Sequence, residues 1–363
     1  MKISRIIIVV VAIAIVAIVG LYAFEVLLAP SAPSSSAWRP AAAYPLELSG
    51  AYGVAGQQCV NSTTYIYCIG GQDLNGGPRS EIFSSPSISS SSSNITSWAS
   101  DSVQYPQNIH GQSCVAYSGY VYCVGGSYDD NADDVASSYY APLSGDTVGT
   151  WSAATAFPIP VDSQSCVASS GYVYCVGGNN ETDGTNADSA SSNSVWYAPL
   201  SSSGIGSWSQ TTAYPGNLYF PTCFSSDSYI YCLGGADGNN NAQSTDYYAT
   251  LSSTGVGTWT KTTAYVVQAS GQACAISSGY IYCLGGEEGE NTYTGAAYYA
   301  AVSSGGIGTW KQMASYPLSI GTTCVISSGS MYCIGGFDGS SAGESSAVYY
   351  ASLASLSSSS STG

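Results

Sequence analysis

The stretch SCVASSGYVYCVGG at residues 165–178 decides how this chain folds. Two alternating apolar runs flank Ser170-Gly171, and a Gly-containing dipeptide at that place is typical of a two-residue β-hairpin turn. Counting outward from the turn, Cys166 faces Cys175 in the fourth pair, which is a non-hydrogen-bonded one. The Cα atoms of such a pair lie about 4.5 Å apart, just inside the range for a disulfide. The stretch therefore predicts a hairpin closed by a disulfide.

The same element recurs six times. Each copy is a Cys-x8-Cys segment followed by Gly-Gly, and the Gly-Gly pairs fall at 70–71, 125–126, 177–178, 234–235, 285–286 and 335–336. All twelve cysteines belong to such segments. The predicted disulfides are Cys59–Cys68, Cys114–Cys123, Cys166–Cys175, Cys223–Cys232, Cys274–Cys283 and Cys324–Cys333. Complete pairing of this kind is typical of an oxidising exterior, whereas the spacing does not suit a zinc site.

Each repeat contains more than the hairpin. A polar loop follows the Gly-Gly, an aromatic pair comes next in five repeats, and in four of these a Gly-rich turn and a Trp follow. Each period of about fifty to fifty-seven residues thus holds four short strands. A repeat of this length with four strands is the signature of a β-propeller blade.

The pattern resembles the kelch repeat, in which an apolar strand ends in Gly-Gly before a spaced Tyr and a spaced Trp. The resemblance covers about residues 38–353, and the Cys pair in every repeat departs from the common kelch pattern. Kelch-like copper oxidases use several histidine ligands, which this chain with its single His110 does not supply. Sialidase-type propellers use an arginine cluster, and the body of this chain has only Arg39 and Arg79.

The two ends of the repeat region are complementary. The last repeat lacks a Trp strand, while an unpaired Trp strand, 38–45, precedes the first one. We therefore expect an all-β fold, a six-bladed propeller of four-stranded kelch-like blades, with the N-terminal strand closing the last blade. The six blade tryptophans are 38, 98, 151, 208, 259 and 310, and they and the recurrent tyrosines are expected to pack between blades.

The N-terminus predicts a membrane anchor. Lys2 and Arg5 precede an uncharged apolar run from Ile6 to Phe24, which is long enough for one transmembrane helix with its N-terminus in the cytoplasm. A cleaved signal peptide is the alternative, because small residues follow near Ala29; both place the body outside the cell. The predicted parts are an anchor or signal peptide (1–29), a linker (30–37), the propeller (38–354) and a Ser-rich tail (355–363).

Charge excludes some partners and points to one face. Charged residues make up 8% of the chain, with 22 acids against 6 bases, so nucleic-acid binding is not expected. Sixteen of the 22 acids fall between a Gly-Gly and the next aromatic pair, in loops that share one rim of a propeller. They are Asp73, Glu81, Asp129, Asp130, Asp133, Asp134, Glu181, Asp183, Asp188, Asp237, Asp246, Glu287, Glu288, Glu290, Asp338 and Glu344.

Two interpretations of these loops stay open. The acids keep the protein soluble, or they bind a cation or a partner; the candidate binding residues are Asp73, Asp129, Asp130, Asp133, Asp134, Glu181, Asp183, Asp237, Glu287, Glu288, Glu290 and Asp338. The segments SYDDNADD and NNETDGTNAD offer the oxygen ligands that calcium prefers, without matching an EF-hand loop. No other cofactor is expected.

The sequence favours a non-enzymatic module for adhesion or envelope assembly, with a cell-surface protein or glycan as its partner. The alternatives are an extracytoplasmic carbohydrate-active enzyme that uses two rim carboxylates, and a structural envelope component. His110 is interpreted as a pore-side or loop residue rather than a base. Asn61, Asn94 and Asn180 begin glycosylation sequons in predicted turns or loops.

Overall fold

The computed structural model describes residues 37–45, 47–48, 51–52, 55–73, 77–86, 95–128, 134–180, 191–239, 241–288, 292–319, 321–337 and 344–358. Residues 37–363 form one compact unit. Within the described ranges no helix is long and apolar enough to cross a membrane. The predicted anchor or signal peptide lies outside these ranges, and so do Asn94 and, of the tail, residues 359–363.

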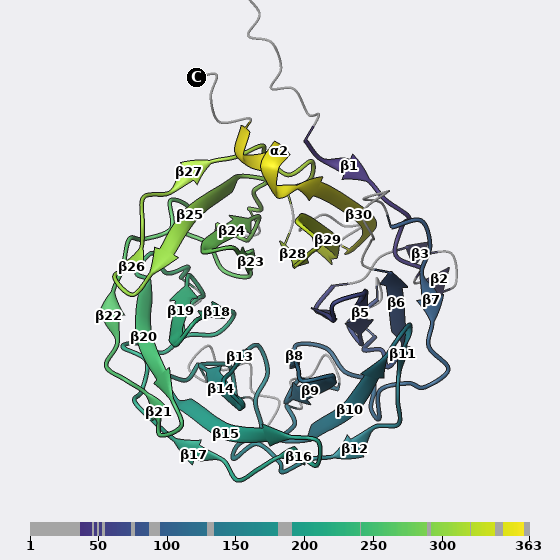
Figure 1. The fold of residues 1–363 in the computed structure, drawn as a ribbon, viewed down its shortest axis with the longest axis horizontal. Coiled ribbons are helices and arrows are strands. Elements are labelled where there is room, and N and C mark those ends of the chain that lie inside the picture. Colours follow the sequence, from purple (N-terminus) through teal and green to yellow (C-terminus); the bar gives the residue numbers. More distant parts are fainter. Residues whose placement is uncertain are drawn as a thin grey trace, which may run out of the picture. The chain divides into compact units, whose positions relative to one another are not determined.

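The unit is a six-bladed β-propeller of four-stranded antiparallel blades arranged around a central axis (Figure 1). Blade 1 comprises β4 (Gln58–Asn61), β5 (Tyr65–Ile69), β6 (Ile82–Pro86) and β7 (Ala99–Ser100). Blade 2 comprises β8 (Ser113–Tyr117), β9 (Tyr120–Val124), β10 (Ser138–Ser144) and β12 (Ser152–Ala153). Blade 3 comprises β13 (Ser165–Ser169), β14 (Tyr172–Val176), β15 (Val195–Ser201) and β17 (Ser209–Gln210).

The other three blades repeat this order. Blade 4 comprises β18 (Thr222–Ser226), β19 (Tyr229–Leu233), β20 (Tyr247–Ser252) and β22 (Thr260–Lys261). Blade 5 comprises β23 (Ala273–Ser277), β24 (Tyr280–Leu284), β25 (Ala297–Ser303) and β27 (Lys311–Gln312). Blade 6 comprises β28 (Gly321–Ser327), β29 (Ser330–Phe337), β30 (Glu344–Ser352) and the N-terminal β1 (Arg39–Pro40).

Short additional pairs extend some blades. In blades 2 to 5 the third strand continues into a hairpin with β11 (Thr147–Val148), β16 (Gly204–Ile205), β21 (Gly255–Val256) and β26 (Gly306–Ile307). A separate two-stranded pair joins β2 (Glu47–Leu48) to β3 (Ala51–Tyr52).

The predicted ring closure is confirmed. Strand β1 pairs with β30 in the register Arg39 to Tyr350 and Pro40 to Tyr349. The chain then continues from β30 into helix α2 (Leu353–Ser358), whose fully buried Leu356 joins the core of the last blade. This helix occupies part of the segment that the sequence assigns to the Ser-rich tail.

The predicted hairpin register is confirmed in all six blades. In blade 3, Cys166 lies opposite Cys175, and the turn residues Ser170 and Gly171 both have positive φ, as a type I′ turn requires. The six predicted disulfides are present, with Cα–Cα distances of 4.0–4.2 Å. The weaker turn formers at 63–64 and 227–228 keep the same Cys register.

Aromatic pairs join each blade to the next. In every pair the ring that follows one outer strand meets the Trp of the next outer strand in an edge-to-face contact, with centroids 4.8–5.2 Å apart. The six pairs are Tyr44–Trp98, Tyr105–Trp151, Phe157–Trp208, Tyr214–Trp259, Tyr265–Trp310 and Tyr316–Trp38. Five of the six indole N–H groups also donate to a backbone carbonyl in the neighbouring connection. The blade tryptophans are therefore structural, as expected.

Candidate binding site at the centre of the propeller

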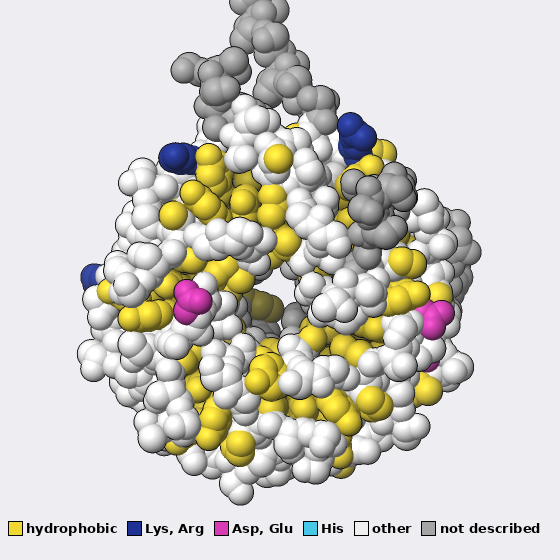
Figure 2. Space-filling model, viewed as in Figure 1, with side chains coloured by type: hydrophobic (Ala, Val, Ile, Leu, Met, Phe, Trp, Pro, Cys, Tyr) yellow, Lys and Arg dark blue, Asp and Glu magenta, His cyan; other side chains and the backbone are white. Residues whose placement is uncertain are grey.

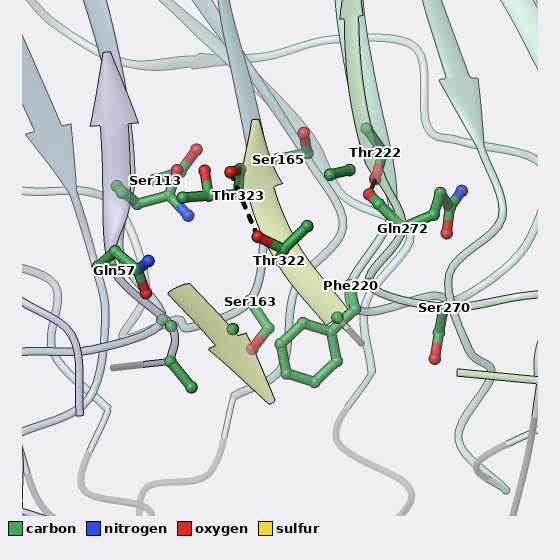
Figure 3. Close-up of a pocket in the computed structure, with 18 of the residues that line it drawn as sticks. Gln57, Ser113, Ser163, Ser165, Phe220, Thr222, Ser270, Gln272, Thr322 and Thr323 are labelled. Carbon is green, nitrogen blue, oxygen red and sulfur yellow. Dashed lines mark hydrogen bonds between the residues drawn. The ribbon is translucent and has the colours of Figure 1, made fainter. Parts of the chain in front are cut away.

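The innermost strands surround a cavity of about 540 Å³ on the axis. That volume lies within the range of small-molecule sites, roughly 300–1,000 Å³. The first Cys of each pair contributes to its wall, together with hydroxyl and amide side chains from several blades. Figure 3 shows these polar side chains around the opening, among them Gln57, Ser113, Thr222 and Thr322. The face seen along the axis in Figure 2 is hollowed at its centre and carries few charged side chains.

The mouth of the cavity is built from two kinds of segment in each blade. One precedes the innermost strand, and the other follows the Gly-Gly. Five antiparallel bridges join them: Ala55 to Gln72, His110 to Ser127, Asp162 to Asn179, Tyr219 to Ala236, and Ser270 to Glu287. The loops after the Gly-Gly and the connections between blades therefore meet on one face, as predicted from the sequence.

A belt of backbone hydrogen bonds runs from blade to blade around the mouth. The N–H of Gly111 donates to the carbonyl of Gly56, and the belt continues through Ser163 and Phe220 to Gly271, with distances of 2.9–3.3 Å. All five residues have positive φ, between 50° and 66°. In blade 6, Gly321 stands at the corresponding position and begins β28 instead. The belt thus places one residue of each of five consecutive blades at a fixed position on the mouth.

Glutamine side chains brace the blades just behind this belt. The Nε2 atoms of Gln57, Gln112 and Gln164 donate to the carbonyl just before the Gly-Gly of the preceding blade, at 2.7–2.9 Å. These side chains are 1–6% exposed. Sequence reasoning missed this role, although a Gln two residues before the first Cys in four repeats could have revealed it. Blade 4 has Pro221 there.

The two halves of the cavity differ in chemistry. Blades 4, 5 and 6 contribute the aromatic rings of Phe220, Tyr293 and Phe337, of which the last two meet edge to face at 5.6 Å. Polar side chains come from all six blades, and the partly exposed ones include Gln72, His110, Asp162, Thr222 and Thr323. Lysine and arginine are absent from the described lining. A ligand in this cavity meets aromatic rings on the side of blades 4, 5 and 6 and hydrogen-bonding groups on every side.

Ionisable side chains are few in the cavity. His110 lines it, which agrees with the pore-side interpretation of this residue. Asp162 also lines it and accepts a hydrogen bond from the hydroxyl of Ser163 at 2.8 Å. Glu287 belongs to the lining as well, and the phenol of Tyr293 donates to its carboxylate at 3.3 Å. Of these three residues, sequence reasoning singled out only His110 and Glu287.

Some of the candidate rim acids have structural roles. Asp73 is 6% exposed, forms an ion pair with Arg79 and accepts a hydrogen bond from the backbone of Gly77. Asp237 accepts backbone hydrogen bonds from Asn239 and Asn241, and these donors hold the pKa of its carboxyl below the usual value.

Other candidates are placed less closely or lie outside the description. Asp134 is half-buried next to the mouth bridge of Ser127, and Glu288 is exposed beside Glu287. The remaining seven candidates fall outside the described residues, and they are Asp129, Asp130, Asp133, Glu181, Asp183, Glu290 and Asp338.

One acid of these loops lies between blades instead of at the surface. Asp246 is 1% exposed, and its two carboxylate oxygens accept hydrogen bonds from the backbone N–H groups of Gly234 and Tyr265. Burial raises its pKa to about 6, although the two N–H donors partly oppose this shift. A carboxyl with a raised pKa is the feature expected of an enzyme, but this one braces blade 4 against the next connection and does not line the cavity.

Metal binding finds no support among the described residues. Within them, no three His, Cys, Asp or Glu side chains lie close enough to hold a metal ion. The two segments predicted to offer calcium ligands lie mostly outside the described ranges, so calcium binding stays a prediction.

Comparison with known proteins supports the fold alone. No family model matches the chain, and no curated protein matches it either. Among solved structures, 672 chains match. One of them, described as "Structure of YjhT", superposes with a TM-score of 0.65 at 11% identity over 85% of this chain and 95% of that one. The propeller is therefore confirmed, and the resemblance to the kelch family stays a prediction.

Proposed function

We propose that this chain is a binding module that works outside the cell, and that its contact surface is the mouth of the central cavity with the acidic loops around it. The observation that carries the proposal is the cavity itself. It is lined by segments from all six blades, with aromatic rings on one half and polar side chains all around. Propellers commonly present binding sites in this manner, and fold alone does not select a ligand.

The location outside the cell rests on the cysteines. Six disulfides and no free cysteine among the described residues indicate an oxidising environment. Attachment to the membrane through residues 1–29 rests on the sequence. Mass spectrometry of the mature N-terminus, with membrane fractionation, tests it: an intact Met1 in the membrane fraction supports the anchor, and a new N-terminus near residue 30 contradicts it.

The acidic loops extend the proposed contact surface. Those described leave directly from the mouth, since Asp237 and Glu288 each follow a residue of a mouth bridge. A calorimetric titration with calcium, in the millimolar range, separates a cation-binding role from a purely electrostatic one. Measurable heat supports cation binding, and its absence leaves the acids as contacts for a partially positive partner.

Binding to arrays of neutral and acidic glycans and of envelope proteins tests the proposed function. The probe is the oxidised propeller, residues 37–363, which forms a compact unit. Thr323→Trp places a large side chain in the cavity wall, whereas Thr147→Trp, on an exposed outer turn, is the matched control. We expect selective binding that Thr323→Trp removes and Thr147→Trp preserves. Equal binding by both variants would place the contact elsewhere on the molecule.

A further inference from the structure

One residue of the mouth breaks the repeat. Residues three before the first Cys are Gly56, Gly111, Ser163, Phe220 and Gly271 in blades 1 to 5, and Gly321 in blade 6. Glycine or a small residue is expected there, because the belt requires positive φ. Phe220 adopts φ of 50° with a bulky side chain, which is a strained conformation.

Core packing does not offset the strain at Phe220. The ring of Phe220 is 46% exposed, among the most exposed large apolar side chains of the described residues. Its described ring contact is with the adjacent Tyr219, at 5.3 Å and a tilt of 54°. In an otherwise regular repeat, a residue that adopts a strained backbone conformation without gaining core packing is typical of a functional position.

The ring faces the cavity. Figure 3 shows Phe220 projecting from its connection into the opening, and its side chain belongs to the lining of the cavity. The belt fixes the backbone on both sides of the ring, since Phe220 donates to Ser163 and accepts from Gly271. The ring therefore stands on a rigid support, which favours a defined binding geometry.

The surroundings of the ring select a class of ligand. The partly exposed lining residues Gln72, Ser165 and Thr323 carry amide and hydroxyl groups that can donate and accept hydrogen bonds around a polar ligand. The carboxylates of Asp162 and Glu287, with no lysine or arginine in the described lining, disfavour an anionic ligand. A ligand with one apolar face, several hydroxyls and no negative charge therefore fits the aromatic and polar side chains of this lining.

We infer that Phe220 is a stacking platform for a neutral pyranose ring bound at the mouth of the central cavity. The C–H face of the sugar lies on the aromatic ring, and its hydroxyls hydrogen-bond to the polar side chains of the cavity lining. This inference rests on the proposed function and specifies its ligand. A peptide with an apolar side chain also contacts an exposed Phe, and its backbone N–H and C=O groups match a polar lining as well, so the test includes protein ligands as a contradicting outcome.

The test compares variants at this position on neutral glycans. The oxidised propeller is screened against glucose, galactose, mannose and N-acetylglucosamine oligomers and against glucuronate-bearing glycans, and the strongest neutral ligand is titrated by calorimetry. We expect Phe220→Gly to weaken its affinity at least about tenfold, because the aromatic face is lost. Phe220→Tyr and Phe220→Trp should stay within about threefold. Tyr280→Ala, which removes an exposed ring outside the cavity, should leave the affinity unchanged.

Each other outcome overturns the inference in a different way. Neutral-sugar binding that survives Phe220→Gly removes the stacking role but leaves a binding module. Binding only to acidic glycans or to an envelope protein removes the sugar class and again leaves the module. No binding to any glycan or protein contradicts both the inference and the proposed function. Circular dichroism of Phe220→Gly, expected to match the parent, excludes unfolding as the cause of a loss.

Discussion

The outer contacts between blades and the mouth of the cavity follow opposite rules. The aromatic pairs recur six times with nearly the same geometry, and only Phe157 departs from Tyr–Trp. The mouth bridges instead join different residues in each of the five blades where they are described. Repetition marks the positions that hold the ring together, because every blade interface must solve the same packing problem. Variation at the mouth marks positions that the packing between blades leaves free to differ.

The largest loss of stability is expected at one of the repeated aromatic contacts between blades. Trp38 is 5% exposed, meets Tyr316 edge to face and donates to the carbonyl of Ala314. Trp38→Ala removes this contact and weakens ring closure, so we expect the free energy of unfolding to fall by about 3–5 kcal/mol. Urea unfolding followed by tryptophan fluorescence measures it. Tyr280→Ala, at a 43% exposed ring, is the control, and an equal loss in both variants would contradict the special role of the repeated pairs.

The next largest loss of stability is expected at the disulfide of blade 3, which joins a cavity-lining residue to a core residue. Cys166 lines the cavity, and its partner Cys175 is 1% exposed in the core. Replacing both by Ala opens a ten-residue loop. The unfolded chain then gains conformational entropy, which should lower the free energy of unfolding by about 2–3 kcal/mol. Urea unfolding under oxidising conditions checks this value. In reducing buffer, the difference in urea midpoint between this variant and the parent should be smaller than in oxidising buffer. An unchanged midpoint in oxidising buffer would refute the structural role of this disulfide.

A buried acid of the blade interface predicts a pH dependence. Because burial raises the folded-state pKa of Asp246 to about 6, above the usual value of an aspartate, the folded protein holds this proton more tightly than the unfolded chain. Its contribution to stability is therefore full below about pH 4 and is lost as the pH rises to about 6, by about 3 kcal/mol. Asp246→Asn should remove this slope from urea midpoints measured between pH 3.5 and 7.

Asp237 is the matched control for that experiment. Its pKa is lowered by backbone donors, so its contribution is present at neutral pH and is lost as the pH falls. Asp237→Asn should leave the slope between pH 4 and 6 in place. If Asp246→Asn keeps the parent's slope as well, the raised pKa is refuted.

The smallest effect on stability is expected at the mouth, where a substitution should not destabilise the fold. Phe220→Gly removes the strain of a positive φ from a bulky residue and exposes no core, so the free energy of unfolding should rise by about 1 kcal/mol or stay level. Thermal unfolding by calorimetry measures it, with Trp38→Ala scanned beside it. A fall comparable to that of Trp38→Ala would show that Phe220 is a packing residue and that the contrast between the two regions fails.

The sequence by itself determined the scaffold. Gly-Gly pairs, the Cys-x8-Cys hairpins, the spaced tryptophans and the unpaired strand at 38–45 together led to six blades, six disulfides and closure by the N-terminal strand. These features are predictable because hairpin register and strand spacing depend on neighbours close in the chain, and because a repeat states each rule six times.

Only the tertiary structure decided the site. Sequence reasoning placed the acids of the loops together on one rim, but Asp73 and Asp246 turned out to be buried braces. It also passed over Phe220, because a single aromatic residue in one of six connections carries no meaning until the belt shows that the position requires positive φ. The site joins residues from six blades that lie far apart in the sequence, and their distances to the axis depend on how the ring closes. Local pattern cannot encode that geometry.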